Sequence, residues 1–329
     1  MKFVIIRVRS GKIEAEKYTG DMTVNMIWLT GDAVVDLIPD GESHYLKCPG
    51  GAPANVAVAI SRLGGKSAFF GRVGFDPMGK FMRQTLSEES VNTEHLYLDK
   101  AQRTSTVVVD LDDHGERSFT FMVKPSADQF LTTADIPQFH QNEWLHVCSI
   151  ALANEPSRSS TIAAIQQIKQ AGGSFSFDPN LREEVWLNPE EMIPTVMQVV
   201  RLADVVKFSE EELTLLTGTE TIEEGIQALA GFSIPLVVIT LGAEGTLIVT
   251  QGEKIKVPSR SVNVVDTTGA GDAFVGGMLC RLSEFEQWKN RETIIDAVTW
   301  GNCCGGLATT QKGAMTALPA RDDLLRLIG

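Results

Sequence analysis

Residues 261–282, SVNVVDTTGAGDAFVGGMLCRL, combine a glycine-rich turn with an acidic residue at the start of an apolar stretch. They predict a strand ending at Asp266, a tight turn, and a helix beginning near Asp272. N–H groups at a helix N-terminus attract an anion, and glycines let the backbone approach it closely. The N–H groups expected to do so belong to Gly269, Ala270 and Gly271.

Asp272 would face this anion, which is typical of a general base. Such a base takes the proton of an attacking hydroxyl while N–H groups and Mg²⁺ hold a phosphoryl group. The alternative is an aspartate that only caps a helix. Helix capping explains a lone G-A-G-D. It does not explain the full pattern of an apolar strand, the turn D-T-T-G-A-G-D and an apolar helix.

Other cofactor motifs are absent from the sequence. Lys66 and Ser67 follow Gly65 as in a P-loop, but Ile60 stands where the first glycine is required. No G-x-G-x-x-G follows a strand, and the histidines and cysteines lack metal-ligand spacings. P-loop enzymes, nicotinamide oxidoreductases and zinc hydrolases are therefore not indicated.

A second group of polar residues is expected to bind a polyol substrate. Gly50 and Gly51 allow close backbone approach, and Asn55 offers both a donor and an acceptor. Asp32 and Asp36 follow the first strand, where α/β proteins bind ligands. Asn180 and Arg182, in DPNLR, also follow a strand. Turn formation, capping and a surface ion pair remain the alternatives for these residues.

Weaker signals point to a nucleotide and its metal ion. Glu212, in SEEEL, is a candidate for organising Mg²⁺, or else one acid of a negatively charged first helical turn. The string TLGAEG contains Thr240, Gly242 and Gly245 and suits a nucleotide edge, although a tight hairpin would look the same. Lys207 and Asn302 are also assigned to the nucleotide site. The alternative for Asn302 is that it is only a polar residue of helix 292–310.

The charge balance limits the partners. The chain has 329 residues, and its 29 Lys and Arg against 42 Asp and Glu give a net charge of −13. Such a chain repels a nucleic-acid backbone, although a few local N–H groups can still bind a small anion. No membrane-spanning segment is found, and the five cysteines favour reduced thiols in the cytoplasm.

The elements that must position these residues alternate between strands and helices from Met26 onward. Residues 53–65 and 76–90 read as helices, 67–74 as a strand, and 174–178, 204–209 and 236–242 as buried strands. This alternation predicts an α/β core of three layers with a mostly parallel sheet. Two hairpins, within about 34–48 and 103–124, interrupt it and are expected to form a small β-sheet lid. Residues 1–21 are expected to lie outside the domain formed by 22–329.

The motifs GGAPAN (50–55) and DTTGAGD (266–272) together resemble both signatures of the ribokinase-like (PfkB) sugar kinases. GDAVVDLIPDGE, FDPNLR and KGAMTALP are further similar to bacterial fructokinases, with aminoimidazole riboside kinases the nearest alternative. The resemblance implies an ATP-dependent kinase that phosphorylates D-fructose to fructose 6-phosphate. It also implies a homodimer formed through the lid.

The resemblance assigns roles to individual residues. It makes Asp272 the base, with sugar contacts from Asp36, Gly51 and Asn55. Several members bind a monovalent cation such as K⁺, and the matching loop residues are Asp266, Thr268, Ala308, Gln311 and Gly313. The family's N-x-x-E reads Ser209-Glu210-Glu211-Glu212 here, so the role of the Asn is not carried over. A sugar-sensing protein without activity is a further alternative, but this chain retains the base and the glycines.

Overall fold

The structure, a computed structural model, describes residues 3–9, 12–18, 24–111 and 117–329. Its centre is an eight-stranded sheet in the order β16-β15-β14-β13-β12-β11-β3-β6. From β6 to β14 the neighbours run parallel, and β15 and β16 add antiparallel at the β14 edge. The strands are β3 Met26–Thr30, β6 Lys66–Phe69, β11 Trp144–Cys148, β12 Ser174–Asp178, β13 Val205–Ser209, β14 Leu236–Thr240, β15 Thr246–Thr250 and β16 Glu253–Val257. The mostly parallel α/β sheet expected from the sequence is confirmed.

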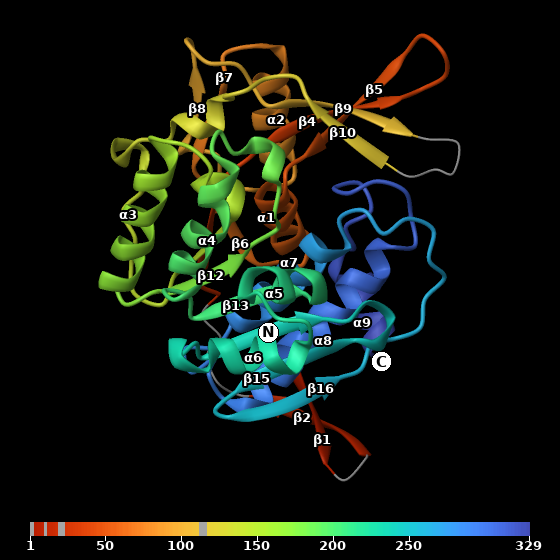
Figure 1. Ribbon diagram of the computed structural model, residues 1–329. Coiled ribbons are helices and arrows are strands. Elements are labelled where there is room, and N and C mark those ends of the chain that lie inside the picture. The colour runs from red at the N-terminus through yellow and green to blue at the C-terminus, as the bar shows by residue number, and fades with distance from the viewer. Residues whose placement is uncertain (1–2, 10–11, 19–23, 112–116) are drawn as a thin grey trace.

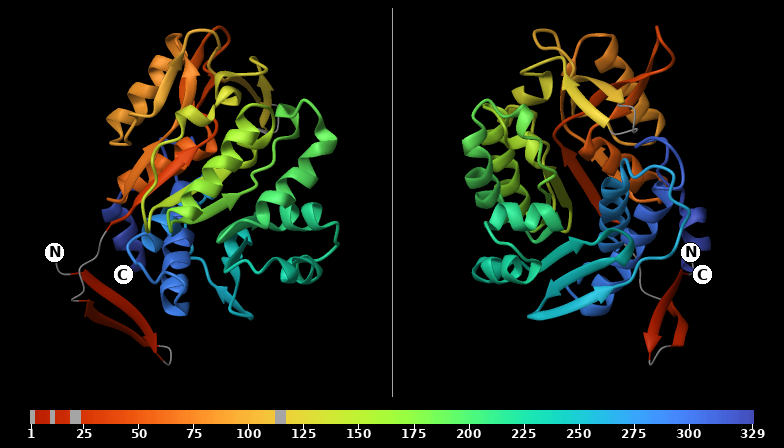
Figure 2. Two further views of the ribbon diagram at one scale, coloured as in Figure 1. Left: turned by 90° about the vertical axis from the view of Figure 1, so that its left-hand side faces the viewer. Right: turned by 45° about the vertical axis from the view of Figure 1, so that its right-hand side comes forward.

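Helices cover both faces of this sheet and complete three layers (Figures 1 and 2). Strand β14 shows why, because its side chains alternate between two apolar cores: Leu236 and Val238 face one, Val237 and Ile239 the other. The first core includes residues of α1 Ala52–Arg62, α2 Pro77–Glu88, α7 Ala270–Leu282, α8 Arg291–Ala308 and α9 Arg321–Ile328. The second includes residues of α3 Ser157–Gln170, α4 Met192–Val200, α5 Glu210–Thr217 and α6 Ile222–Leu229.

The two expected hairpins form one separate four-stranded sheet, called here the small sheet (Figure 1). Its strands are β4 Val34–Pro39, β5 Tyr45–Gly50, β9 Thr106–Leu111 and β10 Arg117–Phe121, in the order β10-β9-β4-β5. Each hairpin is antiparallel, and β4 and β9 join them in parallel. Residues 112–116, where the second turn was expected, lie outside the described residues.

Residues 67–74 were predicted as one strand, and this prediction is wrong. β6 lies at an edge of the central sheet, whereas β7 Gly71–Gly74 pairs in parallel with β8 Leu96–Asp99. The chain changes direction at Gly71, whose φ of 151° suits glycine. Apolar residues continue through this point, so periodicity alone does not reveal the change of sheet.

The first residues form an antiparallel hairpin of β1 Phe3–Arg9 and β2 Lys12–Tyr18 with no other strand partner in the described part of the chain. The hairpin projects from the body in all three views (Figures 1 and 2). Residues 1–2, 10–11 and 19–21 of the expected leader, and residues 22–23 after it, lie outside the described ranges. Within those ranges, no helix has the length and apolar character needed to cross a bilayer.

Candidate active site

Helix α7 begins at Ala270, directly after Gly269, whose φ of 76° is left-handed. A Cβ on Gly269 would lie 2.9 Å from the Cα of Ala314, so this turn requires glycine. The strand predicted to end at Asp266 is absent. Val265 is exposed, and the N–H groups of Val265 and Asp266 both donate to the Thr309 carbonyl, at 2.7 and 3.1 Å. The C-terminus of α8 therefore positions the glycine-rich turn.

The N-terminus of α7 supplies backbone donors. Ala270 N–H donates to the Thr267 carbonyl at 3.2 Å and so is already bonded within the turn. The N–H groups of Gly271 and Asp272 lie in the first helical turn, where helix geometry provides no intrahelical acceptor. The helix dipole adds partial positive charge at the same point.

Asp272 lies half-buried in this first turn and accepts a hydrogen bond of 2.8 Å from Asn55 Nδ2. Burial raises the pKa of Asp272 from 3.8 to about 6, while Asn55, Lys207 and Arg182 act in the opposite direction. A carboxylate with a pKa just below neutrality is ionised at pH 7 and still basic enough to take a proton. These are the properties of a general base.

Lys207, on β13, places a buried positive charge beside the same helix end. Its Nζ lies 3.2 Å from both carboxylate oxygens of Asp178 and would be 3.6 Å from a Cβ on Gly271. Burial alone would disfavour the ammonium, but Asp178, Glu212 and Asp272 together raise the pKa of Lys207. The lysine is therefore charged and adds to the anion-attracting field of α7. Asp178 was not singled out from the sequence, although its place at the end of a buried strand is a usable signal.

Glu212 is held by the start of α5. It forms a capping box with Ser209, in which Oε2 accepts from Ser209 N–H at 2.9 Å, and Oε1 accepts from Leu181 N–H at 3.1 Å. Glu212 therefore caps α5. This agrees with the alternative in which it is one acid of a negatively charged first helical turn. The charge of Glu212 still reaches the site through its effect on Lys207.

The expected polyol-binding residues come together between the central sheet and the small sheet. A Cβ on Gly51 would lie 2.4 Å from the Asp32 carbonyl oxygen, and one on Gly50 would lie 2.6 Å from Asp36 Oδ2. Asp32 is 5% exposed. Burial, with Asp128 and Asp272, raises the pKa of Asp32 to about 7, and Arg182 opposes this shift. Arg182 itself is exposed, and its Nη1 donates to the Leu181 carbonyl.

Unpartnered polar atoms mark this region. In the described part of the chain, three buried side-chain atoms lack a hydrogen-bond partner: Asp32 Oδ1, Asn55 Oδ1 and Trp186 Nε1. Buried polar groups are almost always satisfied, so each exception calls for an explanation. Asp32 and Asn55 are the residues expected to meet substrate hydroxyls, which would supply the missing donors.

The expected nucleotide residues lie at the end of β14 and beyond. Thr240 Oγ1 donates to the Phe208 carbonyl at 3.2 Å. Gly242 and Gly245 have positive φ values of 56° and 98°, and a Cβ on Gly245 would lie 2.2 Å from the Val257 carbonyl oxygen. Asn302 is buried and bonds Thr246 Oγ1 and the carbonyls of Val257 and Pro258. Its amide joins α8 to the sheet edge, which matches the structural alternative.

The loop expected to bind a monovalent cation is organised by Asp266. One carboxylate oxygen accepts from Thr268 N–H and Oγ1 at 3.0 and 2.7 Å, and the other accepts from Gly313 N–H at 3.0 Å. Ala308 and Gln311 stand on either side of Thr309, whose carbonyl bonds the start of the loop. Any cation ligands here would therefore be chiefly backbone carbonyls. Among the residues that the structure describes, no group of three or more His, Cys, Asp and Glu is arranged for a metal.

Comparisons with known proteins agree with this geometry. The family model described as pfkB family carbohydrate kinase matches residues 25–321. A fructokinase of Vibrio alginolyticus is 61% identical over 306 residues, covering 93% of this chain and 100% of that protein. A crystal structure of the Vibrio cholerae O395 fructokinase in its fructose-, ADP- and calcium-bound form is 68% identical with a TM-score of 0.90, covering 93% and 99% of the two chains. The aminoimidazole riboside kinase of Salmonella enterica, complexed with aminoimidazole riboside and an ATP analogue, is 38% identical with a TM-score of 0.87, covering 93% and 100%.

Proposed function

The chain belongs to the pfkB family of carbohydrate kinases, and we propose that it transfers the γ-phosphoryl group of ATP to the 6-hydroxyl of D-fructose. The observation that carries the proposal is Asp272, a half-buried carboxylate with a raised pKa at the N-terminus of α7, bonded to Asn55. The identity of 61% to a fructokinase supports the choice of sugar.

In the proposed reaction Asp272 receives the proton of the sugar hydroxyl. The freed oxygen attacks the γ-phosphorus, a new O–P bond forms, and the bond between the γ-phosphorus and the bridging oxygen breaks to release ADP. The amides of Gly271 and Asp272 and the Lys207 ammonium stabilise the negative charge on the transferring group. The Asp272 carboxylate does not face that charge unpaired, because Asn55 bonds it.

The sugar would bind between the central and small sheets. Asn55 Oδ1 and Asp32 Oδ1 accept from its hydroxyls, and Asp36 and the backbone at Gly50 and Gly51 complete the site. Arg182 supplies positive charge at its rim, since it lowers the pKa values of both Asp32 and Asp272. The small sheet acts as a lid that excludes water and so prevents wasteful hydrolysis of ATP.

The residues present fit an Mg²⁺ ion that binds together with ATP, through the ATP phosphates. They do not fit an ion coordinated by protein ligands alone. Mg²⁺ is commonly held by substrate phosphates with few protein carboxylates, and when bound it neutralises phosphate charge. Glu212 would act on it through its charge, because backbone N–H groups engage both carboxylate oxygens. The Asp266 loop, with Thr268 and Gly313, would offer carbonyls to K⁺. Thr240, Gly242 and Gly245 would line the nucleotide.

We also propose that the chain forms a homodimer through the small sheet. Strands β5 and β10 are the two edges of this sheet, and Tyr45 and Leu46 on β5 are each 57% exposed. Unprotected edges with exposed apolar residues favour pairing with another chain. Sedimentation velocity should show a dimer, and Leu46→Lys should shift it toward monomer. A wild-type monomer at all concentrations would exclude the dimer.

The substrate is tested by ADP release in a coupled assay with Mg·ATP. The panel is D-fructose, aminoimidazole riboside, D-ribose and 2-keto-3-deoxygluconate. We expect fructose to give the highest kcat/KM and fructose 6-phosphate as its product. A higher kcat/KM for any other member of the panel would replace the substrate assignment, and no ADP release with any of them would remove the kinase assignment.

A further inference from the structure

A small pocket of about 40 Å³ lies next to Asp32. Its lining includes Asp32 after β3, Phe121 and Lys124 at the end of the small sheet, and the loop that carries Trp186. Asp128 lies on its wall. Asp272 and Asn55 are not among its lining residues, so the pocket is distinct from the phosphoryl end of the site.

Two of the unpartnered buried atoms belong to residues that line this pocket. Asp32 Oδ1 is an acceptor and Trp186 Nε1 is a donor, and their residues are 5% and 4% exposed. An indole N–H can only donate, and an unpartnered carboxylate oxygen accepts, so each needs a partner of the opposite kind. One hydroxyl group meets both needs, because it donates one hydrogen bond and accepts others.

The other polar groups of the pocket bond to one another. Asp128 accepts from Ser126 Oγ and Gln129 Nε2, and Gln129 Oε1 accepts from Asn154 Nδ2 at 3.1 Å. These hydrogen bonds give the polar side chains of the pocket wall their partners. Asp32 and Trp186 therefore remain as the residues that would bind a ligand.

Trp186 is held in place by its neighbours. Asn154 donates to the Val185 carbonyl at 3.1 Å and accepts from Leu187 N–H at 3.3 Å, which fixes the backbone on both sides of the tryptophan. The Arg158 guanidinium lies 5.5 Å from the indole ring centre, a cation–π distance. The indole N–H therefore has a defined position before any ligand arrives.

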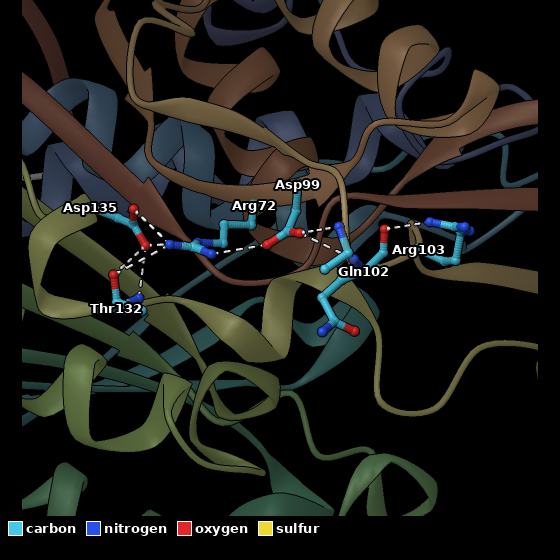
Figure 3. Close-up of polar contacts among 7 residues, drawn as sticks. Arg72, Asp99, Gln102, Arg103, Thr132 and Asp135 are labelled. Carbon is cyan, nitrogen blue, oxygen red and sulfur yellow. Dashed lines mark hydrogen bonds and ion pairs between the residues drawn. The ribbon is translucent and has the colours of Figure 1, made fainter.

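Arg72 of β7 holds the segment that follows Asp128 through Asp135 (Figure 3). The guanidinium donates to Asp135 at 2.8 and 3.1 Å and to Asp99 at 2.9 Å, and Asp135 accepts from Thr132 N–H at 2.8 Å. These bonds join the segment that follows Asp128 to the β7–β8 pair. Asn154 thus holds the pocket at Trp186, and Arg72 holds the segment that follows Asp128.

Asp32 connects the pocket to the reacting end of the site. The charges of both Asp128 and Asp272 act on it and raise its pKa, so it lies within electrostatic reach of the pocket wall and of the base. A sugar that presents one end to Asp272 would have Asp32 beside it and its other end at the pocket.

We infer that this pocket binds the C1 hydroxymethyl group of fructose, with Trp186 Nε1 donating to O1 and Asp32 Oδ1 accepting from it. This inference rests on the proposed function. A pocket volume of about 40 Å³ exceeds the roughly 10–15 Å³ that one ordered water requires, so the pocket has room for a hydroxymethyl group. Aminoimidazole riboside carries a ring nitrogen on its anomeric carbon instead of a hydroxymethyl group, so it offers no hydroxyl to these two atoms. Trp186 is therefore a specificity-determining residue.

The test compares D-fructose with 1-deoxy-D-fructose, which lacks O1. In the wild type we expect KM for the deoxy sugar to be about tenfold higher, equivalent to about 1.4 kcal/mol, with a similar kcat. Trp186→Phe keeps the ring and removes only the N–H. It should raise KM for fructose about tenfold, leave kcat within about twofold, and leave KM for 1-deoxy-D-fructose unchanged.

Trp288→Phe is the matched control. It also removes a buried indole N–H, one that donates to Ser174 Oγ at 3.0 Å away from the pocket. It should leave both KM values unchanged.

Four results would overturn the inference: equal KM values for the two sugars in the wild type, an equal effect of Trp186→Phe on both sugars, no effect of this variant on fructose, or fructose 1-phosphate as the product. Each can occur while fructose is still phosphorylated, so each leaves the kinase assignment intact. A wild type that does not phosphorylate fructose would instead remove the proposed substrate and this inference with it.

Discussion

Asn55 Nδ2 donates a hydrogen bond of 2.8 Å to Asp272 Oδ2 and so joins the first turn of α1 to the first turn of α7. The two residues are 217 positions apart in sequence. The bond fixes one oxygen of the proposed base and leaves Asn55 Oδ1 to accept from the sugar. Sugar binding and proton transfer therefore share one amide.

Removing this bond should change the pH dependence of catalysis. The acid limb of kcat/KM should lie near pH 6, because Asp272 must be ionised to accept a proton. Asn55 lowers the pKa of Asp272, so Asn55→Leu should move the limb upward by about one pH unit and also raise KM. Asn290→Ala removes an exposed helix cap with no contact to the site and should leave the limb in place. An unshifted limb in Asn55→Leu would show that the bond does not tune the base.

Asp32 should make stability depend on pH. Its pKa rises from 3.8 in the unfolded chain to about 7 in the folded protein, so between these values the folded state holds the extra proton. Stability therefore falls as the pH rises through this window. Asp32→Asn cannot ionise and should be more stable than the wild type at about pH 8 by about 2–4 kcal/mol, with little difference at about pH 4. Urea unfolding at both pH values measures this, with the exposed Asp40→Asn as control. Equal differences at the two pH values would contradict the pKa assignment.

Lys207 should be required for stability as well as for phosphate binding. Lys207→Met leaves the buried Asp178 without its cation, which should cost about 3–5 kcal/mol. Lys169→Met removes a half-exposed pair with Asp204 and should cost less than about 1 kcal/mol. Adding Asp178→Leu to Lys207→Met should recover much of the loss. The pair would be shown to be unimportant if both lysine variants unfolded at the same denaturant concentration.

Gly51 should not tolerate a side chain. Its φ is 96°, and a Cβ would lie 2.4 Å from the Asp32 carbonyl oxygen, so Gly51→Ala must move backbone in the sugar site. Gly218→Ala shares the positive φ, at 66°, but meets nothing within 4 Å. We expect a loss of about 1–2 kcal/mol for Gly218→Ala and a larger loss, with raised KM for fructose, for Gly51→Ala. Similar decreases in melting temperature for Gly51→Ala and Gly218→Ala would mean that the backbone at Asp32 moves aside at little cost in stability.

Much of this fold follows from local sequence. Strand β14 is a nearly uninterrupted apolar run because both of its faces are buried, and α1 lies between Gly51 and Gly64, both with positive φ. The turn at Gly269 and the acid at Asp272 are likewise local, because glycine and a helix start decide them. Such features need no knowledge of distant residues.

The errors and omissions depend on distant parts of the chain. The apolar residues before Asp266 were expected to pair as a strand, but α8 takes up their N–H groups through Thr309. Trp186 and Asp128 carry no local motif. They gain meaning only because folding brings them beside Asp32 in one pocket. Tertiary contacts of this kind cannot be read from residue spacing.

The most direct test of the account is the turnover of Asp272→Asn with D-fructose and Mg·ATP. Asparagine keeps the shape of the side chain and cannot accept the proton, and a neutral group in this half-buried position should not weaken the fold. We predict an unchanged circular dichroism spectrum, fructose and ATP binding close to that of the wild type, and a kcat lower by about 10²–10⁴-fold. A kcat within about tenfold of the wild-type value would contradict the role of Asp272 as the base.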